Sequence, residues 1–171
     1  TKSQYLWCAE QLRHLNLDVY GIGVSSFLKH KKYEQGIEKI LSIKDKLPKK
    51  AVIHALGCGS RGYQAILSAL GISLFDSLSY FYYSIYHKKL DPITVCSVGK
   101  CLKKQRCEKC LSVIKNDNSK SLFQYNLHEI LKENWRMQCA IRGGTVEEYL
   151  TERLSKRYLQ VWKQFRRVLY D

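Results

Sequence analysis

Apolar residues follow two spacings along the first 90 positions, and each spacing predicts a different kind of element. Apolar positions three or four apart predict amphipathic helices, whereas short unbroken apolar runs are typical of buried strands. The predicted elements are, in order, a helix over 5–17, a strand over 19–24, a helix over 33–47, a strand over 51–56, a helix over 60–70 and a strand over 72–75. Strands and helices that alternate with short connections indicate an α/β fold built from parallel βαβ units.

Each predicted strand runs into glycine or polar residues at its carboxyl end. Ser25-Ser26 follow the first strand, Gly57 to Ser60 follow the second, and Asp76 follows the third. Parallel strands of α/β folds bring their carboxyl ends to one edge, where such folds carry their chemistry. Asp76 is therefore a candidate functional carboxylate, and its alternative role is a plain helix N-cap.

The pattern changes in the second half of the chain. Residues 96–120 hold four of the seven cysteines and many lysines, with little apolar periodicity. Helical spacing then returns and is interrupted by Gly143-Gly144, after which Thr145 and Glu148 predict a capping box for a last helix. We therefore expect three parts, over residues 1–92, 93–142 and 143–171.

Charge is strongly one-sided, because 29 lysines and arginines stand against 15 acidic residues and give a net charge of +14. This balance favours a polyanionic partner, since each cation placed on a phosphate releases counterions; a basic soluble protein without such a partner is the alternative. No uncharged apolar run reaches 18 residues, so no membrane span is expected. An odd number of cysteines without a disulfide-scaffold spacing predicts reduced thiols and a cytoplasmic location.

The cysteine-rich segment has the spacing of a metal site. Cys107 and Cys110 form a CxxC knuckle, and Cys101 precedes it by six residues. Thiolates two residues apart on a tight turn can bind one tetrahedral Zn²⁺, with Cys96 or His128 as a further ligand. The alternatives are a redox pair or incidental surface cysteines. The remaining cysteines lie on otherwise apolar faces and are expected to be core residues: Cys8, Cys58 and Cys139.

Six short segments at the strand ends and in the later helices can be compared with known families. They are Tyr-Gly-Ile-Gly-Val at 20–24, His-Ala-Leu-Gly-Cys-Gly-Ser at 54–60, Gly-Ile-Ser-Leu-Phe-Asp-Ser at 71–77, Ser-Leu-Ser-Tyr at 77–80, Asn-Leu at 126–127 and Cys-Ala-Ile-Arg-Gly-Gly at 139–144. Together they resemble the tRNA-guanine transglycosylase family, and its archaeal, archaeosine-forming branch most nearly. The resemblance covers about residues 5 to 155. It implies the C-terminal part of a (β/α)8 TIM barrel, with an inserted zinc-binding subdomain and C-terminal helices.

The resemblance also implies an activity and roles for particular residues. The family replaces guanine in nucleic acid with a 7-deazaguanine base, through a carboxylate that attacks the ribose and forms a covalent intermediate, as in a retaining glycosidase. Asp76 matches the family's nucleophile. Gly23 matches a glycine whose neighbouring backbone groups read the base edge, and Leu56 and Gly57 match the wall on which the base lies. Ordinary strand-end turn chemistry is the alternative for these glycines.

Two departures from the family pattern concern zinc. The family's zinc loop reads Cys-x-Cys-x-x-Cys, and Gln105 stands here at the first of those positions. The family's histidine ligand precedes Asn-Leu, where this chain has Tyr125. By resemblance the zinc ligands are therefore Cys101, Cys107, Cys110 and His128, with Cys96 as the alternative to His128.

A third departure concerns completeness, because the family's barrel has eight strands and only three are predicted here. Three βα units leave unpaired sheet edges, so a missing N-terminal barrel half or a partner subunit is expected to complete the site. The missing half carries the family's second catalytic aspartate. We therefore expect the chain to be inactive by itself. Its start without methionine suggests a fragment or a processed chain.

Basic residues in the cysteine-rich segment and on the predicted last helix are candidates for phosphate contacts, with a solvated basic face as the alternative. They are Lys103, Lys104, Arg106, Arg153, Arg157 and Arg166. Four tyrosines after Asp76 either stack on bases or, as we favour, form the packing face of a helix: Tyr80, Tyr82, Tyr83 and Tyr86. The acceptor is tRNA or DNA, with tRNA favoured. A non-catalytic binding subunit and a zinc-ribbon module are the competing functions.

Overall fold

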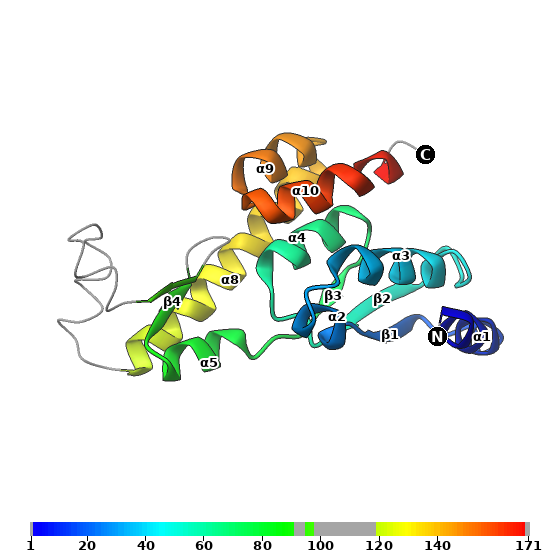
Figure 1. Ribbon diagram of the computed structural model, residues 1–171, viewed down its shortest axis with the longest axis horizontal. Helices are drawn as coiled ribbons and strands as arrows, with labels where there is room; N and C mark the ends of the chain where they lie inside the picture. Colours follow the sequence, from blue (N-terminus) through cyan, green and yellow to red (C-terminus); the bar gives the residue numbers. More distant parts are fainter. Residues whose placement is uncertain (1, 91–94, 98–118, 170–171) are drawn as a thin grey trace. The chain divides into compact units, whose positions relative to one another are not determined.

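The structure is a computed structural model, and it describes residues 2–90, 95–97 and 119–169 (Figure 1). Contacts between Cα atoms divide the chain into two compact units, Thr1–Ser77 with Val161–Asp171, and Leu78–Gln160. These units do not coincide with the three predicted parts. Because much of the segment 93–142 lies outside the described residues, the three predicted boundaries stay a prediction.

The first unit contains a three-stranded parallel sheet in the order β1-β2-β3. Its elements are α1 (Lys2–Arg13), β1 (Val19–Gly23), α2 (Ser25–Lys29), α3 (Tyr33–Lys44), β2 (Val52–Leu56), α4 (Arg61–Ala69) and β3 (Leu74–Phe75). The predicted alternation and the parallel pairing are confirmed. The predicted first helix is shifted along the chain, because α1 begins at Lys2 and ends at Arg13, before Asn16 adopts a left-handed φ of 46°. The third strand is only two residues long.

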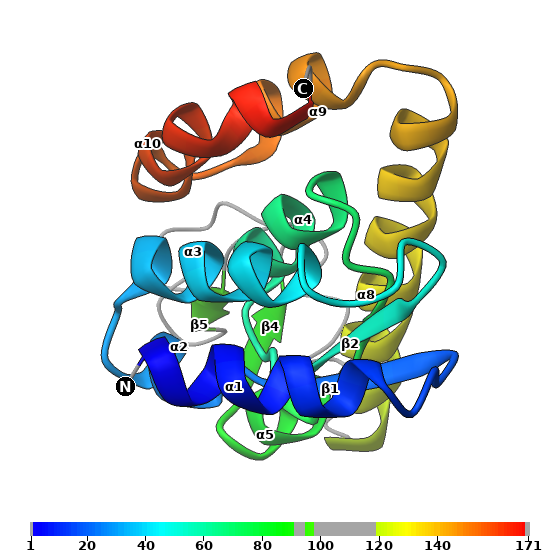
Figure 2. The same cartoon turned by 90° about the vertical axis from the view of Figure 1, so that its right-hand side faces the viewer.

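The two faces of this sheet differ in how well they are covered. Tyr20, Ile22, Ile53 and Ala55 point to one face and are buried. Figures 1 and 2 both show α3 and α4 on one side of the sheet. The alternate residues of the strands are more exposed, including Val19, Leu56 and Leu74 at 48%, 41% and 42%. Parallel sheets are normally covered on both faces, so this second face, here called the open face, is unusual.

The second unit is held together by a buried asparagine. Its elements are α5 (Ser79–Ile85), β4 (Lys88–Leu90), β5 (Val95–Ser97), α8 (Ser119–Arg142) and α9 (Val146–Arg153), with β4 antiparallel to β5. The Oδ1 atom of Asn126 on α8 accepts a hydrogen bond from the Leu90 amide at 2.8 Å. Its Nδ2 atom donates to the Lys88 carbonyl at 3.0 Å and to Ser84 Oγ at 3.1 Å. One side chain thus joins α5, β4 and α8.

A second polar cluster joins α8 to α9. Glu133 is 5% exposed and accepts hydrogen bonds from Arg153 Nε at 2.9 Å and Arg153 Nη2 at 2.7 Å, and from the Tyr149 hydroxyl. The bond to Glu133 raises the pKa of Arg153, and burial raises the pKa of Tyr149. Arg153 is therefore committed to an intramolecular ion pair.

The end of the chain forms two helices where the sequence predicted one. Leu154 has an extended backbone with ψ 139°, which ends α9 before α10 (Lys156–Phe165) and the 3-10 helix η1 (Arg166–Leu169) begin. Thr145 occupies the N-cap position of α9, yet its side chain makes no capping hydrogen bond, so the predicted capping box is wrong. Along the described part of the chain, no helix has the length and apolar character needed to cross a bilayer.

Candidate active site

Asp76 follows β3 directly and has an exposed carboxylate, whose side chain is 55% exposed. Its Oδ1 atom accepts a hydrogen bond from the backbone N–H of Gly57 at 2.7 Å. The same Oδ1 atom lies 3.5 Å from Nε2 of His54. The next helix, α5, begins at Ser79 and has Leu78 in its N-cap position, so the alternative role of Asp76 as an N-cap is wrong. The carboxylate is anchored by neighbouring strands instead.

The backbone conformation at position 57 requires a glycine. Gly57 follows β2 with a φ of +72°, in the left-handed region that side chains disfavour. A Cβ atom at this position would also lie 3.0 Å from Cβ of Ser25. Since this turn carries the N–H that binds Asp76, Gly57 has a positioning role whether or not a base lies beside it.

Gly23 differs from Gly57, because nothing in the fold requires it to be a glycine. Among the residues that the structure describes, a Cβ atom at Gly23 would meet no other atom within 4 Å beyond its chain neighbours. Gly23 pairs with Leu56 in the β1–β2 register, and the side chain of Leu56 extends to 3.1 Å from the position of a Cβ at Gly21. Among the described residues, Gly23 therefore borders open space on the open face, whereas the side chain of Leu56 lies over Gly21.

This difference between the glycines gives a first prediction. We expect Gly23→Ala to change the free energy of unfolding by less than about 0.5 kcal/mol, because the new methyl group enters free space. We expect Gly57→Ala to cost about 1–2 kcal/mol, because alanine is disfavoured at positive φ. Urea denaturation of both variants measures the difference. Equal losses of stability would contradict the distinction.

Cys58 lies next to this site and is fully buried, as predicted for a core cysteine. Burial, and secondarily the charge of Asp76, raises the pKa of its thiol to about 12. The thiol is therefore neutral at ordinary pH and unsuited to act as a nucleophile. The prediction is wrong for Cys8 and Cys139, which are exposed. Cys139 lies beside the buried Ala140 but off the stripe of α8 that is buried.

A second prediction follows from the thiol of Cys58. Its pKa is raised from 9.0 to about 12 in the folded protein, so above pH 9 the unfolded chain loses a proton that the folded protein keeps. Stability is therefore expected to fall as the pH rises from 9 towards 12, by about 1.4 kcal/mol per pH unit from this group. Urea denaturation across this range should show a smaller slope for Cys58→Ala. The exposed Cys139→Ala is the control, and an unchanged slope in Cys58→Ala would contradict the assignment.

Most of the predicted zinc ligands lie outside the described residues. The ligands outside the described residues are Cys101, Cys107 and Cys110. For Cys96 only the backbone is described, in β5. His128 is exposed on α8. Among the residues that the structure does describe, no group of three His, Cys, Asp or Glu side chains could hold a metal ion. The zinc site therefore stays a prediction.

The predicted nucleic-acid contacts also divide into several groups. Lys103, Lys104 and Arg106 lie outside the described ranges, and Arg153 is paired with Glu133. Arg157 on α10 and Arg166 in η1 are exposed. Of this set, these last two present cationic side chains on the described surface.

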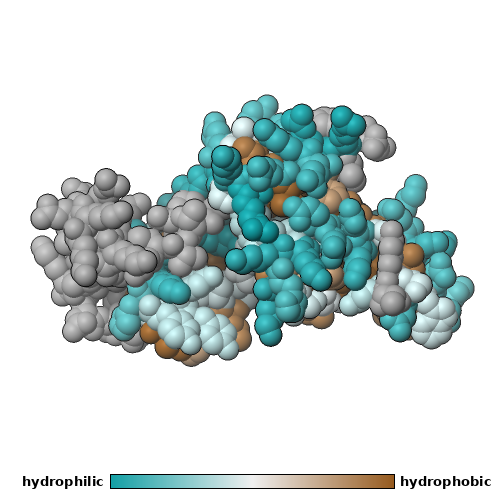
Figure 3. All heavy atoms as spheres, in the orientation of Figure 1, coloured by the Kyte–Doolittle hydropathy of each residue, from teal (hydrophilic) through white to brown (hydrophobic). Residues whose placement is uncertain are grey.

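We predict that the four tyrosines after Asp76 form one packing face of a helix. The structure buries only two of them in part. Tyr80 is half-buried and its ring contacts that of Phe123 with the centroids 5.1 Å apart, and Tyr83 is also half-buried. Tyr82 and Tyr86 are 55% and 65% exposed. Figure 3 shows pale and brown side chains gathered over α5, which is consistent with this exposure. The packing interpretation therefore holds for half of the set.

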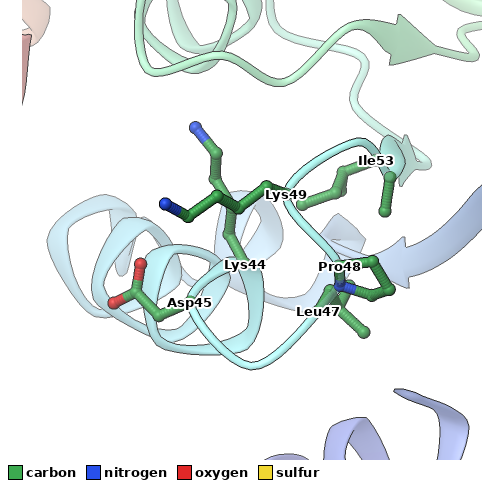
Figure 4. A pocket seen from close by; sticks show the side chains of 7 residues that line it. Lys44, Asp45, Leu47, Pro48, Lys49 and Ile53 are labelled. Atoms are coloured by element: carbon green, nitrogen blue, oxygen red, sulfur yellow. The ribbon is translucent and has the colours of Figure 1, made fainter. Parts of the chain in front are cut away.

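A cavity of about 420 Å³ lies at the other end of β2 (Figure 4). Its walls include Lys44, Lys49, Pro48 and Ile53. Nζ of Lys44 donates a hydrogen bond to the Leu70 carbonyl at 2.8 Å, so that lysine has a structural role. Because the cavity borders the beginning of β2 and Asp76 lies level with its end, the two sites are separate.

Sequence reasoning missed His54, Asn126 and Glu133 as residues with polar roles. His54 could have been found from strand alternation, because it is two residues from Leu56 and therefore shares its face. Asn126 was read only as part of a motif, and its burial is not visible in the local pattern. Glu133 carried no signal, since its partners are 16 and 20 residues away.

The fold and the site define an α/β protein that carries an anchored carboxylate at the carboxyl end of a parallel sheet. No family model matches the chain. Among curated proteins, the chain is 30% identical over 159 residues to the tRNA-guanine(15) transglycosylase of Methanococcus aeolicus. The matched region covers 85% of this chain and 24% of the relative. The corresponding protein of Methanocaldococcus jannaschii is 28% identical over 160 residues, with the same shares. That of Pyrococcus abyssi is 25% identical, over 95% of this chain and 30% of the relative.

These comparisons confirm the resemblance inferred from the strand-end motifs. The chain spans about a quarter of the length of the curated relatives it matches. The similarity therefore concerns one portion of those proteins, and it includes most of this chain.

Proposed function

We propose that this protein takes part in exchanging a guanine base of tRNA for a 7-deazaguanine, with Asp76 as the nucleophile. The observation that carries the proposal is the exposed carboxylate of Asp76, held through one oxygen by Gly57 beside free space on the open face. The names of the relatives, tRNA-guanine(15) transglycosylases, support guanine in tRNA as the substrate.

The proposed reaction has two displacements at one carbon. A carboxylate oxygen of Asp76 attacks the anomeric carbon of the ribose, the glycosidic bond breaks, and guanine leaves with the bonding electron pair and takes up a proton. The incoming 7-deazaguanine then gives up a proton and attacks the same carbon, which releases the carboxylate. The base lies in the free space beside Gly23 and Leu56, and the Gly57 amide keeps the carboxylate oriented in both steps.

The remaining parts of the proposal concern partners. The outer strands β1 and β3 each have one free edge in the described sheet, and its second face is open. Another polypeptide segment, in the same protein or in a partner subunit, is therefore needed to cover that face and complete the site. Zn²⁺ bound by Cys101, Cys107 and Cys110, with His128 or Cys96, has a structural role, and Arg157 and Arg166 contribute to binding phosphates.

The test is to trap the covalent intermediate. The full-length protein is incubated with guanine-containing RNA or DNA, denatured and digested, and the modified peptide is located by mass spectrometry. An RNA adduct on Asp76 is the expected result. An adduct with DNA alone would assign the DNA acceptor, and the absence of an adduct with either acceptor would leave a non-catalytic binding subunit as the function.

A further inference from the structure

We propose that His54 is a positioning residue that fixes the Asp76 carboxylate through Oδ1 and leaves Oδ2 as the attacking oxygen. The inference rests on the proposed function, because it assigns Asp76 as the nucleophile. It adds a residue that the sequence did not indicate, and it assigns separate tasks to the two oxygens of one side chain.

The backbone holds His54 firmly in place. It lies in the middle of β2, paired with Gly21 of β1 on one side and with Leu74 of β3 on the other. The strand alternation places its side chain on the open face, where it is 29% exposed. Gly21, at the paired position of β1, has no side chain, and the side chain of Leu56 lies over that position instead. A residue held by ladders on both sides is well suited to orient a neighbouring group.

Both contacts of the carboxylate fall on the same oxygen. Oδ1 of Asp76 accepts the Gly57 hydrogen bond at 2.7 Å and lies 3.5 Å from Nε2 of His54. Within the described part of the chain, neither of these partners is bound to Oδ2. The Gly57 hydrogen bond and the neighbouring His54 ring both lie at Oδ1 and restrict rotation of the carboxylate, while the lone pairs of Oδ2 remain available for attack.

The distance of 3.5 Å between Nε2 of His54 and Oδ1 of Asp76 is long for a hydrogen bond, so in this structure the two side chains are neighbours without a hydrogen bond between them. A small rotation of either side chain would bring the two atoms into hydrogen-bond range once substrate is bound, as is common for catalytic contacts. The neighbouring thiol of Cys58 does not compete for this role, because it is buried and its pKa is raised to about 12.

The test compares two substitutions of His54 in the full-length protein. His54→Leu removes the N–H donor, whereas His54→Gln keeps an amide donor at a similar distance from the backbone. We expect His54→Leu to slow formation of the covalent adduct in a single turnover by about 10- to 100-fold, the size of effect that misplacing a reacting group has. The KM for RNA and the melting temperature should not change, and His54→Gln should recover most of the rate. His14→Leu, an exposed histidine at the end of α1, is the control.

A second readout does not depend on activity. The amide-proton resonance of Gly57 reports its hydrogen bond to Asp76, and Asp76→Ala marks the position that it takes without the carboxylate. His54→Leu should move the resonance towards that position, and His54→Gln should leave it near the wild-type value. An unmoved Gly57 resonance or an unchanged adduct rate in His54→Leu would overturn the positioning role. If the resonance moves but wild-type protein forms no adduct, the positioning contact stands and the proposed nucleophile fails.

Discussion

Asp76→Asn is expected to lower the rate of adduct formation and of base exchange by about a thousandfold or more, the largest effect on activity that we predict. The amide has no negative charge with which to attack the anomeric carbon, so covalent catalysis is lost. Its carbonyl oxygen still accepts the Gly57 hydrogen bond, and the side chain is exposed, so folding should be preserved. The measurement is single-turnover adduct formation with guanine-containing RNA, alongside a thermal melt.

The matched control is Asp45→Asn, which removes one carboxylate from an exposed position of the same unit. Asp45 follows α3 and precedes β2, at the opposite end of the strand from Asp76. We expect it to retain wild-type rates. An Asp76→Asn protein that forms the adduct as fast as the wild type would exclude Asp76 as the nucleophile.

Asn126→Asp is expected to have the largest effect on stability, a loss of about 4 kcal/mol from the second unit. Nδ2 of Asn126 donates to the Lys88 carbonyl and to Ser84 Oγ, and the side chain is fully buried. The substitution replaces that donor with an acceptor facing a carbonyl oxygen, inside a site with no access to water. Buried polar groups left without partners cost 1–3 kcal/mol each, and a buried unpaired charge costs more.

The control for this prediction is Asn134→Asp, the same chemical change on an exposed position of α8, two turns away. Urea denaturation followed by circular dichroism measures both variants, and the control should stay within about 0.5 kcal/mol of the wild type. Similar stability of the two variants would show that the hydrogen bonds of Asn126 do not hold α5, β4 and α8 together.

The order of helices and strands could be predicted because an element buried on one face has apolar residues at regular spacing along the sequence. The strands β1 and β2 and the helix α3 agree closely with the expected ranges. Among these predicted elements the errors fall at ends and breaks, where one backbone angle decides the outcome, whereas the short helix α2 was not predicted. Asn16 turns the chain after α1, and Leu154 separates α9 from α10. Asn16 belongs to the predicted stop signal Asn16-Leu17-Asp18, but α1 already ends at Arg13; Leu154 is neither a glycine nor a proline and marked no boundary.

Part of the candidate site could be predicted from the sequence. The physical basis for prediction differs from residue to residue. Asp76 was a candidate because strand ends of parallel sheets converge on one edge, whereas Gly23 and Leu56 were candidates through the family resemblance alone. The left-handed φ of Gly57 and its bond to Asp76 were not foreseen, since a glycine in a turn serves many conformations. The position of His54 beside Asp76 depends on the register between β2 and β3.

By itself, the sequence determined the alternation of strands and helices, the candidate carboxylate and the excess of positive charge, since these follow from local spacing and composition. Only the tertiary structure decided which polar groups meet. In the folded chain the Asp76 carboxylate accepts a hydrogen bond from an amide 19 residues away. Arg153, a predicted phosphate contact, forms an ion pair with a glutamate 20 residues away. The residue type alone fixes the charge of a side chain. Whether that charge can bind a ligand depends on which partner the fold brings within hydrogen-bond distance.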